Sequence, residues 1–362
     1  MSIASDMERS LLSVKAITKT FEASRSWLGR GRSSVRAVDG ISFELKAGET
    51  LGLVGETGSG KSTLGRLILR LIEPTSGRII FDGDDFTAKT TVEVRRMRSD
   101  IQMVFQDPYG SLDPRMSVGD LIAEPMIVHG QPRAEIPRRV AEIMNLVGLD
   151  SRVAHRFPHQ FSGGQRQRIG IARAMALAPK LLVLDEPVSA LDVSIQAQIL
   201  NLLREIQRRT GVTYLFVAHD LAVVRHVSDR VAVMYLGRIV EISSRDQLYD
   251  QPRHPYTISL LSAVPAANPK LERVRQRIPV HGEISSGTAI PSGCRFHPRC
   301  FRARLIAAAF PAEAQPFGEH AIPRRCVEQD PVLADVEASH QVACHFDGRY
   351  DGLTKVSLPA PK

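Results

Sequence analysis

A glycine-rich loop at residues 55–63, GETGSGKST, has the residue types and spacing of a phosphate-binding site. It fits the pattern G-x-x-x-x-G-K-[ST], with Gly55, Gly60, Lys61 and Ser62 at the defining positions. The glycines let backbone N–H groups approach phosphate oxygens, Lys61 adds a positive charge, and the Ser62 hydroxyl is a ligand for Mg²⁺. A helix N-terminus alone stabilises an anion by only about 0.3–1 kcal/mol, so a triphosphate also needs the lysine and the metal. The loop therefore predicts a nucleoside triphosphate site.

Two adjacent carboxylates follow the apolar run in LLVLDEP, at residues 181–187. The run predicts a buried strand, and successive side chains of a strand point to opposite sides, so Asp185 and Glu186 can take different roles. We expect Asp185 in the Mg²⁺ shell and Glu186 as the general base for an attacking water. Taken alone, two solvated acids at a strand end would be the simpler interpretation, but the glycine-rich loop needs a magnesium partner.

Two further polar side chains end predicted strands. His219 closes TYLFVAHD and Gln106 closes IQMVFQ. The carboxyl ends of parallel strands form the ligand-binding edge of an α/β sheet, so both residues are expected beside Asp185 and Glu186. His219 is a candidate sensor of the γ-phosphate that holds the Glu186 water. Each residue alone would more often be structural, and only their convergence favours a catalytic role.

A second glycine stretch, FSGGQRQRIGIARAMAL, occupies residues 161–177. Ser162 is a good N-cap, Gly163 and Gly164 expose backbone N–H groups, and the apolar residues that follow recur at helical spacing. This is a second anion site at a helix N-terminus. Because the first loop already wraps its own triphosphate, we expect the second stretch to bind the γ-phosphate of a nucleotide held by another chain.

The elements that position these residues alternate between strands and helices. Strands are predicted at residues 11–21 and 35–45, separated by an exposed insert, and again before the glycine-rich loop. A helix follows with Leu64, Leu67, Ile68 and Leu71 on one face. Further predicted elements are strands at 78–81 and 101–105, a helix-rich stretch at 107–160, a helix carrying Ile195 to Ile206, and a hairpin turning at residues 236–237. The pattern indicates a parallel sheet with a helical insertion.

Composition bounds the class of protein. The chain has 362 residues, of which 43% are hydrophobic and 24% charged, which suffices for a large and a small domain. We place the boundary at residue 242. No window approaches the uninterrupted apolar run of a membrane span, so we expect a protein kept in the cytosol. The net charge of +8 comes from scattered arginines, and by itself it indicates a solvated surface more than a nucleic-acid site.

The ordered set of motifs resembles the nucleotide-binding subunits of ATP-binding-cassette (ABC) transporters over residues 11–240. The resemblance implies an α/β fold, a P-loop NTPase cassette with a β-rich N-terminal subdomain, a RecA-like parallel-sheet core and an inserted helical subdomain at about 107–178. It also implies a head-to-tail dimer with ATP between the chains. The family's motifs fall on the Walker A loop Gly55, Glu56, Thr57, Gly58, Ser59, Gly60, Lys61, Ser62 and Thr63, the Q-loop Gln106, the signature Ser162, Gly163, Gly164 and Gln165, the Walker B pair Asp185 and Glu186, the D-loop at 189–192, and the switch His219.

Two ligand assignments also come from this resemblance. Ser62, Gln106 and Asp185 are implied as Mg²⁺ ligands. Phe21, in KTF, is implied as the aromatic residue that stacks on adenine. The family chemistry is ATP hydrolysis coupled to transport across a membrane.

Finer features are similar to the oligopeptide and dipeptide importer ATPases. These features are RAVDGISFEL, QDPYGSLDPRMSVGDLIAEP, HPYTISLLSAVP at 254–265, PSGCRFHPRC and VACH. The resemblance implies a sister ATPase subunit, two transmembrane permease subunits and an external binding protein that delivers the cargo. It places the chain as a peripheral protein on the cytoplasmic face of the bacterial inner membrane, without a nucleic-acid partner. Related systems carry nickel or glutathione.

All four cysteines lie after residue 293, at Cys294, Cys300, Cys326 and Cys344. Their clustering indicates one local site, but their spacing lacks the CxxC knuckle of structural zinc, so a metal site and four unliganded thiols both stay open. The resemblance implies a [4Fe-4S] cluster, a chemistry that four thiolates support. The chain departs from the family in a long insertion before Cys326, and the proline that follows this cysteine carries the match.

A second class of function stays open from the residues alone. A cassette ATPase that acts on nucleic acid or the ribosome would share the ATP motifs and use the basic charge. The single cassette, the absence of long heptads and the HPYTISLLSAVP segment favour the importer. A binding module without catalysis is disfavoured because Lys61, Asp185, Glu186 and His219 are all present.

Overall fold

A computed structural model describes residues 10–22, 34–107, 110–265, 277–280 and 290–347. Its centre is an eight-stranded sheet in the order β13-β14-β10-β9-β3-β8-β7-β6. The five strands from β6 to β9 in this order are parallel, and β10, β14 and β13 continue the sheet antiparallel. The strands span β3 Thr50–Val54, β6 Ile101–Val104, β7 Leu181–Asp185, β8 Thr213–Ala218, β9 Arg230–Tyr235, β10 Arg238–Ser244, β13 Ala334–Glu337 and β14 His340–Val342.

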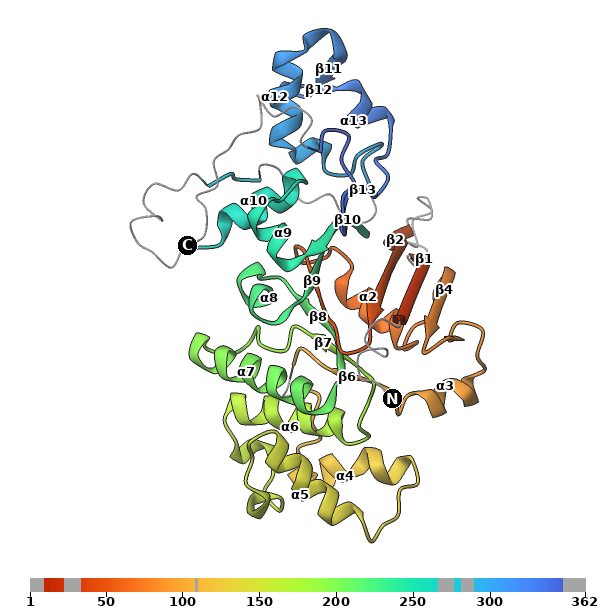
Figure 1. Cartoon of the computed structure of the whole chain (residues 1–362), viewed down its shortest axis with the longest axis vertical. Helices are drawn as coiled ribbons and strands as arrows, with labels where there is room; N and C mark the ends of the chain where they lie inside the picture. The colour runs from red at the N-terminus through yellow and green to blue at the C-terminus, as the bar shows by residue number, and fades with distance from the viewer. Residues whose placement is uncertain (1–9, 23–33, 108–109, 266–276, 281–289, 348–362) are drawn as a thin grey trace, which may run out of the picture.

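A four-stranded antiparallel sheet in the order β2-β1-β4-β5 stands beside the central sheet (Figure 1). Its strands are β1 Ser10–Glu22, β2 Ser34–Lys46, β4 Ser76–Phe81 and β5 Asp84–Asp85. The two long N-terminal strands and the strand at 78–81 are therefore confirmed. The insert predicted between the long strands lies mostly at residues 23–33, outside the described residues.

Helices flank the central sheet and form a separate group below it in Figure 1, where α4, α5 and α6 lie together. That group sits in the sequence between β6 and β7, which confirms the inserted helical subdomain. The helices span α2 Lys61–Ile68, α3 Thr91–Met97, α4 Val118–Val128, α5 Ile136–Leu146, α6 Gly163–Met175, α7 Val193–Thr210, α8 Leu221–Val227, α9 Arg245–Asp250, α10 Pro255–Ala263, α12 Phe301–Ala309 and α13 Arg324–Glu328. None of the helices within the described ranges has the length and apolar character that crossing a membrane requires.

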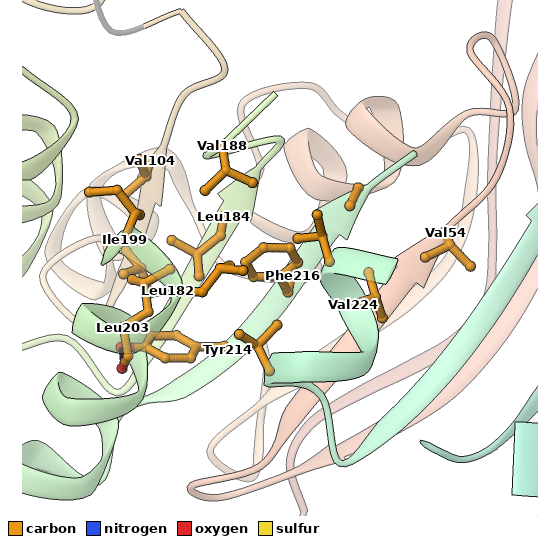
Figure 2. Close-up of a cluster of buried hydrophobic side chains, with 14 of the residues drawn as sticks. Val54, Val104, Leu182, Leu184, Val188, Ile199, Leu203, Tyr214, Phe216 and Val224 are labelled. Atoms are coloured by element: carbon orange, nitrogen blue, oxygen red, sulfur yellow. Dashed lines mark hydrogen bonds between the residues drawn. The ribbon is translucent and has the colours of Figure 1, made fainter. Parts of the chain in front are cut away.

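The core beside the central sheet explains why its strands read as continuous apolar runs. Every residue of β7 and of β8 is buried, as expected for parallel strands covered on both faces. Figure 2 shows Leu182, Leu184 and Phe216 packed between the sheet and residues of α7 and α8. This packing fixes the carboxyl ends of β7 and β8, where the predicted catalytic residues begin.

One detail of the predicted helix after the glycine-rich loop is wrong. The helix α2 ends at Ile68, and Leu71 lies beyond it with 45% of its surface exposed. Arg70 adopts a positive φ of 46°, a left-handed conformation that ends helices. Leu64, Leu67 and Ile68 are buried as predicted.

The hairpin predicted at Leu236 and Gly237 is confirmed. These two residues join β9 to β10, and both have positive φ angles, 42° and 84°. Two successive positive φ angles define the tight turn that matches the twist of antiparallel strands. The turn places the backbone of Gly237 against the phosphate loop, because its N–H donates to the Ser59 carbonyl at 2.9 Å.

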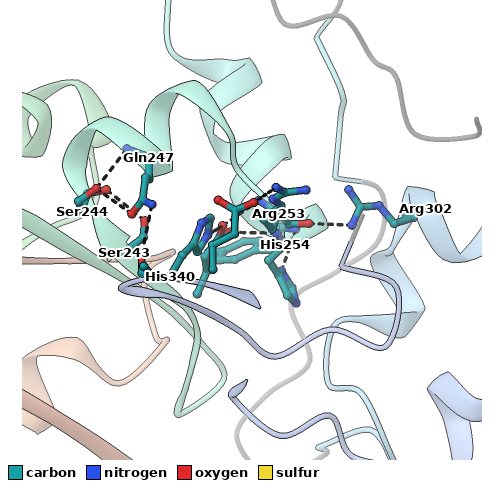
Figure 3. A network of polar contacts seen from close by, with 11 residues as sticks. Ser243, Ser244, Gln247, Arg253, His254, Arg302 and His340 are labelled. Carbon is teal, nitrogen blue, oxygen red and sulfur yellow. Dashed lines mark hydrogen bonds and ion pairs between the residues drawn. The ribbon is translucent and has the colours of Figure 1, made fainter. Parts of the chain in front are cut away.

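The C-terminal segment is joined to the cassette through the central sheet. Strand β14 pairs with β10, so residue 242, the predicted domain boundary, lies within a strand that contacts both parts. The fully buried Glu241 carboxylate accepts hydrogen bonds from the backbone N–H groups of Arg253 and His254, and lies 2.8 Å from His340 Nε2. Figure 3 shows this network between β10, α10 and β14. A separate hairpin, β11 Ala314–Phe317 with β12 His320–Pro323, packs against α12.

Candidate functional site

The phosphate loop connects β3 to α2 in a conformation that requires glycine. Gly58 and Gly60 have φ angles of 82° and 104°. A Cβ at Gly55 would lie 2.2 Å from the Met234 carbonyl oxygen, and a Cβ at Gly60 would lie 2.1 Å from that of Ala37. Both obstructing atoms belong to the backbone and cannot turn aside. The glycines are therefore needed for the loop to lie against its neighbours with its N–H groups at the helix start.

We expect Gly60→Ala to abolish most nucleotide binding. The added methyl group meets the Ala37 carbonyl, and alanine is strained at a φ of 104°, so the loop must move. Isothermal titration with ATP and Mg²⁺ measures the loss, which we expect to exceed tenfold. Gly170→Ala is a matched control in α6, because a Cβ there meets no atom within 4 Å. Wild-type affinity in Gly60→Ala would contradict the proposed loop geometry.

Lys61 is the first residue of α2 and is only 4% exposed. Its ammonium donates to the carbonyl oxygens of Gly55 and Glu56 at 2.7 and 2.9 Å. Burial lowers the pKa of Lys61, while the charges of Glu186, Asp185 and Glu56 oppose this effect. The lysine thus adds a partly desolvated positive charge to the phosphate site, where an electrostatic interaction is stronger than in water.

The side chains of Ser62, at the end of the phosphate loop, and Asp185, at the end of β7, are in contact. The Ser62 hydroxyl donates to Asp185 Oδ1 at 2.9 Å, and Asp185 is buried at the end of β7. Burial raises the pKa of Asp185, and the hydrogen bond from Ser62 partly offsets it. A hydroxyl and a carboxylate this close are suited to share one Mg²⁺ ion, which binds through one or two protein oxygens together with substrate phosphates and water. The donor set fits the expected metal.

Glu186 lies one residue beyond β7 in a strained conformation. Its φ of 48° is in the left-handed region, which costs about 1–3 kcal/mol for a residue other than glycine. The carboxylate Oε2 accepts a hydrogen bond from Gln106 Nε2 at 2.9 Å and lies 3.2 Å from His219 Nδ1. Three residues that the sequence places on three different strand ends therefore meet at one oxygen atom. Gln106, Glu186 and His219 line one open cavity, and Thr57 and the D-loop residues Ser189 and Ala190 line it with them.

A cavity of about 290 Å³ links the loop to the side chains of Gln106 and Glu186. It is lined by Gly58, Gly60, Lys61, Ser62, Thr63, Gln106 and Glu186, and also by residues 35–37 and 236–237. Phe21 is not among its lining residues. This side chain is 40% exposed, lies under the Lys19 ammonium at 5.1 Å, and pairs across the sheet with Val35, which does line the cavity. Val35 and Arg36 lie in the predicted strand at 35–45, and Arg36 begins the segment RAVDGISFEL, but nothing in the sequence indicated that they line this cavity.

The second glycine stretch forms a helix start outside this cavity. Ser162 caps α6 with a capping box, in which its hydroxyl accepts from the Gln165 N–H and the Gln165 side chain accepts from the Ser162 N–H. Neither Gly163 nor Gly164 lines the cavities around Lys61 and Glu186. A Cβ at Gly163 would meet Leu191 of the D-loop at 3.5 Å, an ordinary contact, whereas a Cβ at Gly164 would lie 2.6 Å from Ile195.

The four cysteines converge on one small cavity of the C-terminal segment, which confirms that they form a single local cluster. Cys294, Cys300 and Cys326 are buried, and all four are free thiols. Burial raises the pKa of Cys300 and of Cys326 to about 12, and the neighbouring Cys344 and Cys300 thiols add to it. The parts of the chain that the structure describes contain no group of three or more His, Cys, Asp or Glu side chains arranged to hold a metal ion.

Comparisons with known proteins agree with this geometry. The sequence profile of the ABC transporter family matches residues 38–189, and that of the oligopeptide/dipeptide transporter C-terminal region matches residues 240–306. The chain is 47% identical to the oligopeptide transport ATP-binding protein AppF of Bacillus subtilis, over 94% of this chain and 98% of that protein. It is 48% identical to the oligopeptide transport ATP-binding protein OppF of Salmonella typhimurium, over 85% and 92%.

Among solved structures, the chain is similar to the ATP-binding cassette MJ0796 in its dimeric, post-hydrolysis state bound to ADP and Pi. The TM-score is 0.57 and the identity 29%, over 65% of this chain and 98% of that one. The similarity agrees with ATP hydrolysis as the chemistry of the site. On the strength of matches over nearly its whole length, the chain belongs to the ATP-hydrolysing subunits of the ABC transporter family, within the group that carries the oligopeptide/dipeptide transporter C-terminal region.

Proposed function

We propose that this chain hydrolyses ATP to power the import of di- or oligopeptides across the cytoplasmic membrane. The observation that carries the proposal is the meeting of Gln106, Glu186 and His219 beside the phosphate loop, in a chain whose C-terminal region matches that of oligopeptide transporters. The nucleic-acid alternative has no support beyond the net charge. The relatives that match nearly the full length are named as peptide transport proteins.

The arrangement assigns a role to each side chain of the ATP site. Glu186 takes a proton from the attacking water, and Gln106 and His219 hold its carboxylate and respond to the γ-phosphate. Lys61 and the loop N–H groups stabilise the charge on the phosphate oxygens. Ser62 and Asp185 would hold the Mg²⁺ ion, with Gln106 beside them, and the ion would neutralise charge between the β- and γ-phosphates. Phe21 stays our candidate for the adenine contact.

The chain supplies only half of each complete ATP site in this proposal. Ser162, Gly163, Gly164 and Gln165 lie at the start of a 13-residue helix and outside the two cavities around Lys61 and Glu186. They are suited to bind the γ-phosphate of ATP on a second, sister ATPase subunit, and that subunit would return the same contact.

Two permease subunits would receive the closing motion, an extracytoplasmic binding protein would deliver the peptide, and the ATPase pair would lie on the cytoplasmic face.

Loss of peptide uptake tests this function directly. Cells that lack the gene should fail to accumulate a radiolabelled tripeptide, and wild-type protein should restore uptake, whereas Lys61→Ala should not, because the phosphate charge is left without its lysine. Nickel and glutathione uptake are measured in parallel to identify the cargo. In the purified protein, the logarithm of nucleic-acid affinity should show no dependence on the logarithm of salt concentration. Unchanged uptake in the deletion strain, or a steep salt slope, would contradict the proposal.

A [4Fe-4S] cluster held by Cys294, Cys300, Cys326 and Cys344 is a second part of the proposal. Four thiols that line one cavity match the ligand number of such a cluster. Burial raises the pKa of Cys300 and Cys344, and the Arg302 charge partly offsets this effect. The cluster would need four thiolates, and it would tie residues 294–344 of the C-terminal segment together.

We expect anaerobically purified protein to contain about four iron and four sulfide per chain, because one [4Fe-4S] cluster bound by the four thiolates contains four of each. Iron, acid-labile sulfide and the visible absorbance are measured together. Cys300→Ser should lose most of the iron, whereas Ser259→Ala, a buried substitution outside the thiol cavity, should retain it. Zinc without sulfide in the wild-type protein would overturn the cluster proposal.

We also propose a functional division of the chain near residue 242. Residues 1–242 would form the nucleotide-binding domain, with the helical subdomain at about 107–178, and residues 243–362 would form the cysteine-containing extension. The pairing of β10 with β14 means that the two parts share one sheet.

A further inference from the structure

The segment between Cys294 and Cys300 contacts the phosphate loop through Arg299. Arg299, which directly precedes Cys300, is only 8% exposed, and its guanidinium donates to both carboxylate oxygens of Glu56 at 2.8 and 3.2 Å. Burial acts to lower the pKa of Arg299, but the hydrogen bonds to Glu56 and Tyr235 outweigh it and raise the pKa. A bidentate pair between an arginine and a carboxylate fixes orientation as well as position.

The backbone of Glu56 is held from the same side. Its N–H donates to the Tyr256 hydroxyl at 2.9 Å, and its carbonyl oxygen accepts from Lys61 at 2.9 Å. Tyr256 is buried and its ring lies 5.4 Å from that of Phe296, within the segment between the cysteines. Glu56 therefore contacts both the phosphate-binding Lys61 and the C-terminal residues Tyr256 and Arg299.

A second connection joins the same segment to the far end of the loop. Arg295 donates to the carbonyl oxygen of Leu236 and forms an ion pair with Asp39. Gly237, which follows Leu236, donates its N–H to the Ser59 carbonyl oxygen at 2.9 Å. Its own carbonyl oxygen accepts a hydrogen bond from the Asp39 N–H at 2.9 Å. Two loop residues before Lys61 are therefore held by the C-terminal segment. Glu56 pairs directly with Arg299, and Ser59 is bound by Gly237, whose neighbour Leu236 accepts a hydrogen bond from Arg295.

We propose that Arg299 is a positioning residue of the ATP site, which acts through Glu56 to hold the phosphate loop in its binding conformation. The inference rests on the proposed assignment of residues 55–63 as the ATP-binding loop, and it makes the cysteine-bracketed segment a determinant of ATP affinity. Without Arg299, the partly buried Glu56 carboxylate loses its two charge-assisted bonds and the loop loses a fixed point. Gln106, Glu186 and His219 keep their contacts, so the change should affect binding more than chemistry.

Arg299→Gln in the full-length protein tests the proposal through a comparison of ATP affinity and turnover. We expect the Kd for ATP and the KM to rise about tenfold, as the loss of hydrogen bonds to a charged group implies, while kcat at saturating ATP stays within about threefold. Arg299→Lys, which keeps the charge but loses the fork, should lie between wild type and Arg299→Gln. Arg304→Gln removes an arginine from the neighbouring helix α12 and should leave both values unchanged.

A double-mutant cycle shows whether Arg299 acts through Glu56. In the Glu56→Gln background, Arg299→Gln should raise the Kd by less than twofold, because the partner charge is already gone. Tyr256→Phe, a smaller change in the same cluster, should weaken ATP binding about threefold in protein that still unfolds cooperatively. Unchanged affinity in Arg299→Gln, or equal effects in the two backgrounds, would overturn the inference. Failure of the wild-type protein to bind ATP would instead overturn the proposed function.

Discussion

Glu186→Gln should leave ATP binding intact and lower the rate of ATP hydrolysis by about 10²–10⁴-fold. The amide has nearly the shape of the carboxylate, and its oxygen can still accept the hydrogen bond that Gln106 donates at 2.9 Å. It cannot take a proton from water, and a positioned general base contributes about this factor. Phosphate release under single-turnover conditions measures the chemical step, and ATP titration measures binding.

The same variant should trap ATP between two chains, because ATP held between the phosphate loop of one chain and the 162–165 stretch of the other is no longer hydrolysed. Gel filtration with ATP and Mg²⁺ measures the dimer. Glu205→Gln is a suitable control, because this carboxylate lies on α7 and pairs with Arg208 and Arg209 away from the site. Undiminished turnover in Glu186→Gln would refute the general-base role and leave the source of catalysis to other groups.

A bulky residue at Gly163 should separate ATP binding from ATP hydrolysis. A Cβ there makes only an ordinary contact with Leu191 within its own chain, so Gly163→Leu should fold and bind ATP at its own phosphate loop with affinity within about twofold of wild type. The side chain would cover the N–H groups that the helix offers to a second chain. We expect hydrolysis to fall by about 10²-fold, the effect of removing one donor from a site of developing charge.

The choice of Gly163 over its neighbour matters for this experiment. A Cβ at Gly164 would lie 2.6 Å from Ile195, so a substitution there would disturb α7 as well as the dimer contact. Hydrolysis and equilibrium binding of a fluorescent ATP analogue are compared in Gly163→Leu and wild type, alone and mixed with the sister subunit. Loss of binding at the chain's own loop would place the stretch within that site and contradict its role across the dimer.

The sequence predicts the cassette well where local pattern and sheet rules act together. The apolar run Thr50–Val54 before the loop, the buried runs at β7 and β8, and the turn at Leu236 and Gly237 follow from burial on both faces and from turn chemistry. Leu71 shows the limit, because helical periodicity continues past Ile68 while a left-handed Arg70 ends the helix. A backbone change at one residue leaves no periodic signal.

The parts of the site that the sequence does not reveal depend on long-range contacts. Arg299 and Glu56 are 243 positions apart in the sequence, and no sequence pattern around either residue indicates that the two side chains are in contact. Val35 and Arg36 line the cavity beside the phosphate loop because β2 passes next to that loop, and this placement depends on the packing of two sheets. A motif indicates the residues that take part in the chemistry. The residues that hold the motif in place are charged and aliphatic side chains, and their role can be recognised only in the folded structure.

The shared sheet also has a consequence for the synthesis of the protein. Glu241 and His340 are separated by 99 positions, and at about 5–20 residues per second the second is made about 5–20 s after the first. During that interval β10 is an open sheet edge with a carboxylate that lacks its histidine, and such edges invite pairing with other chains. The ATP-binding half of the nascent protein is thus complete in sequence well before it is complete as a folded unit. Chaperone capture or early assembly with a partner is most valuable in this window.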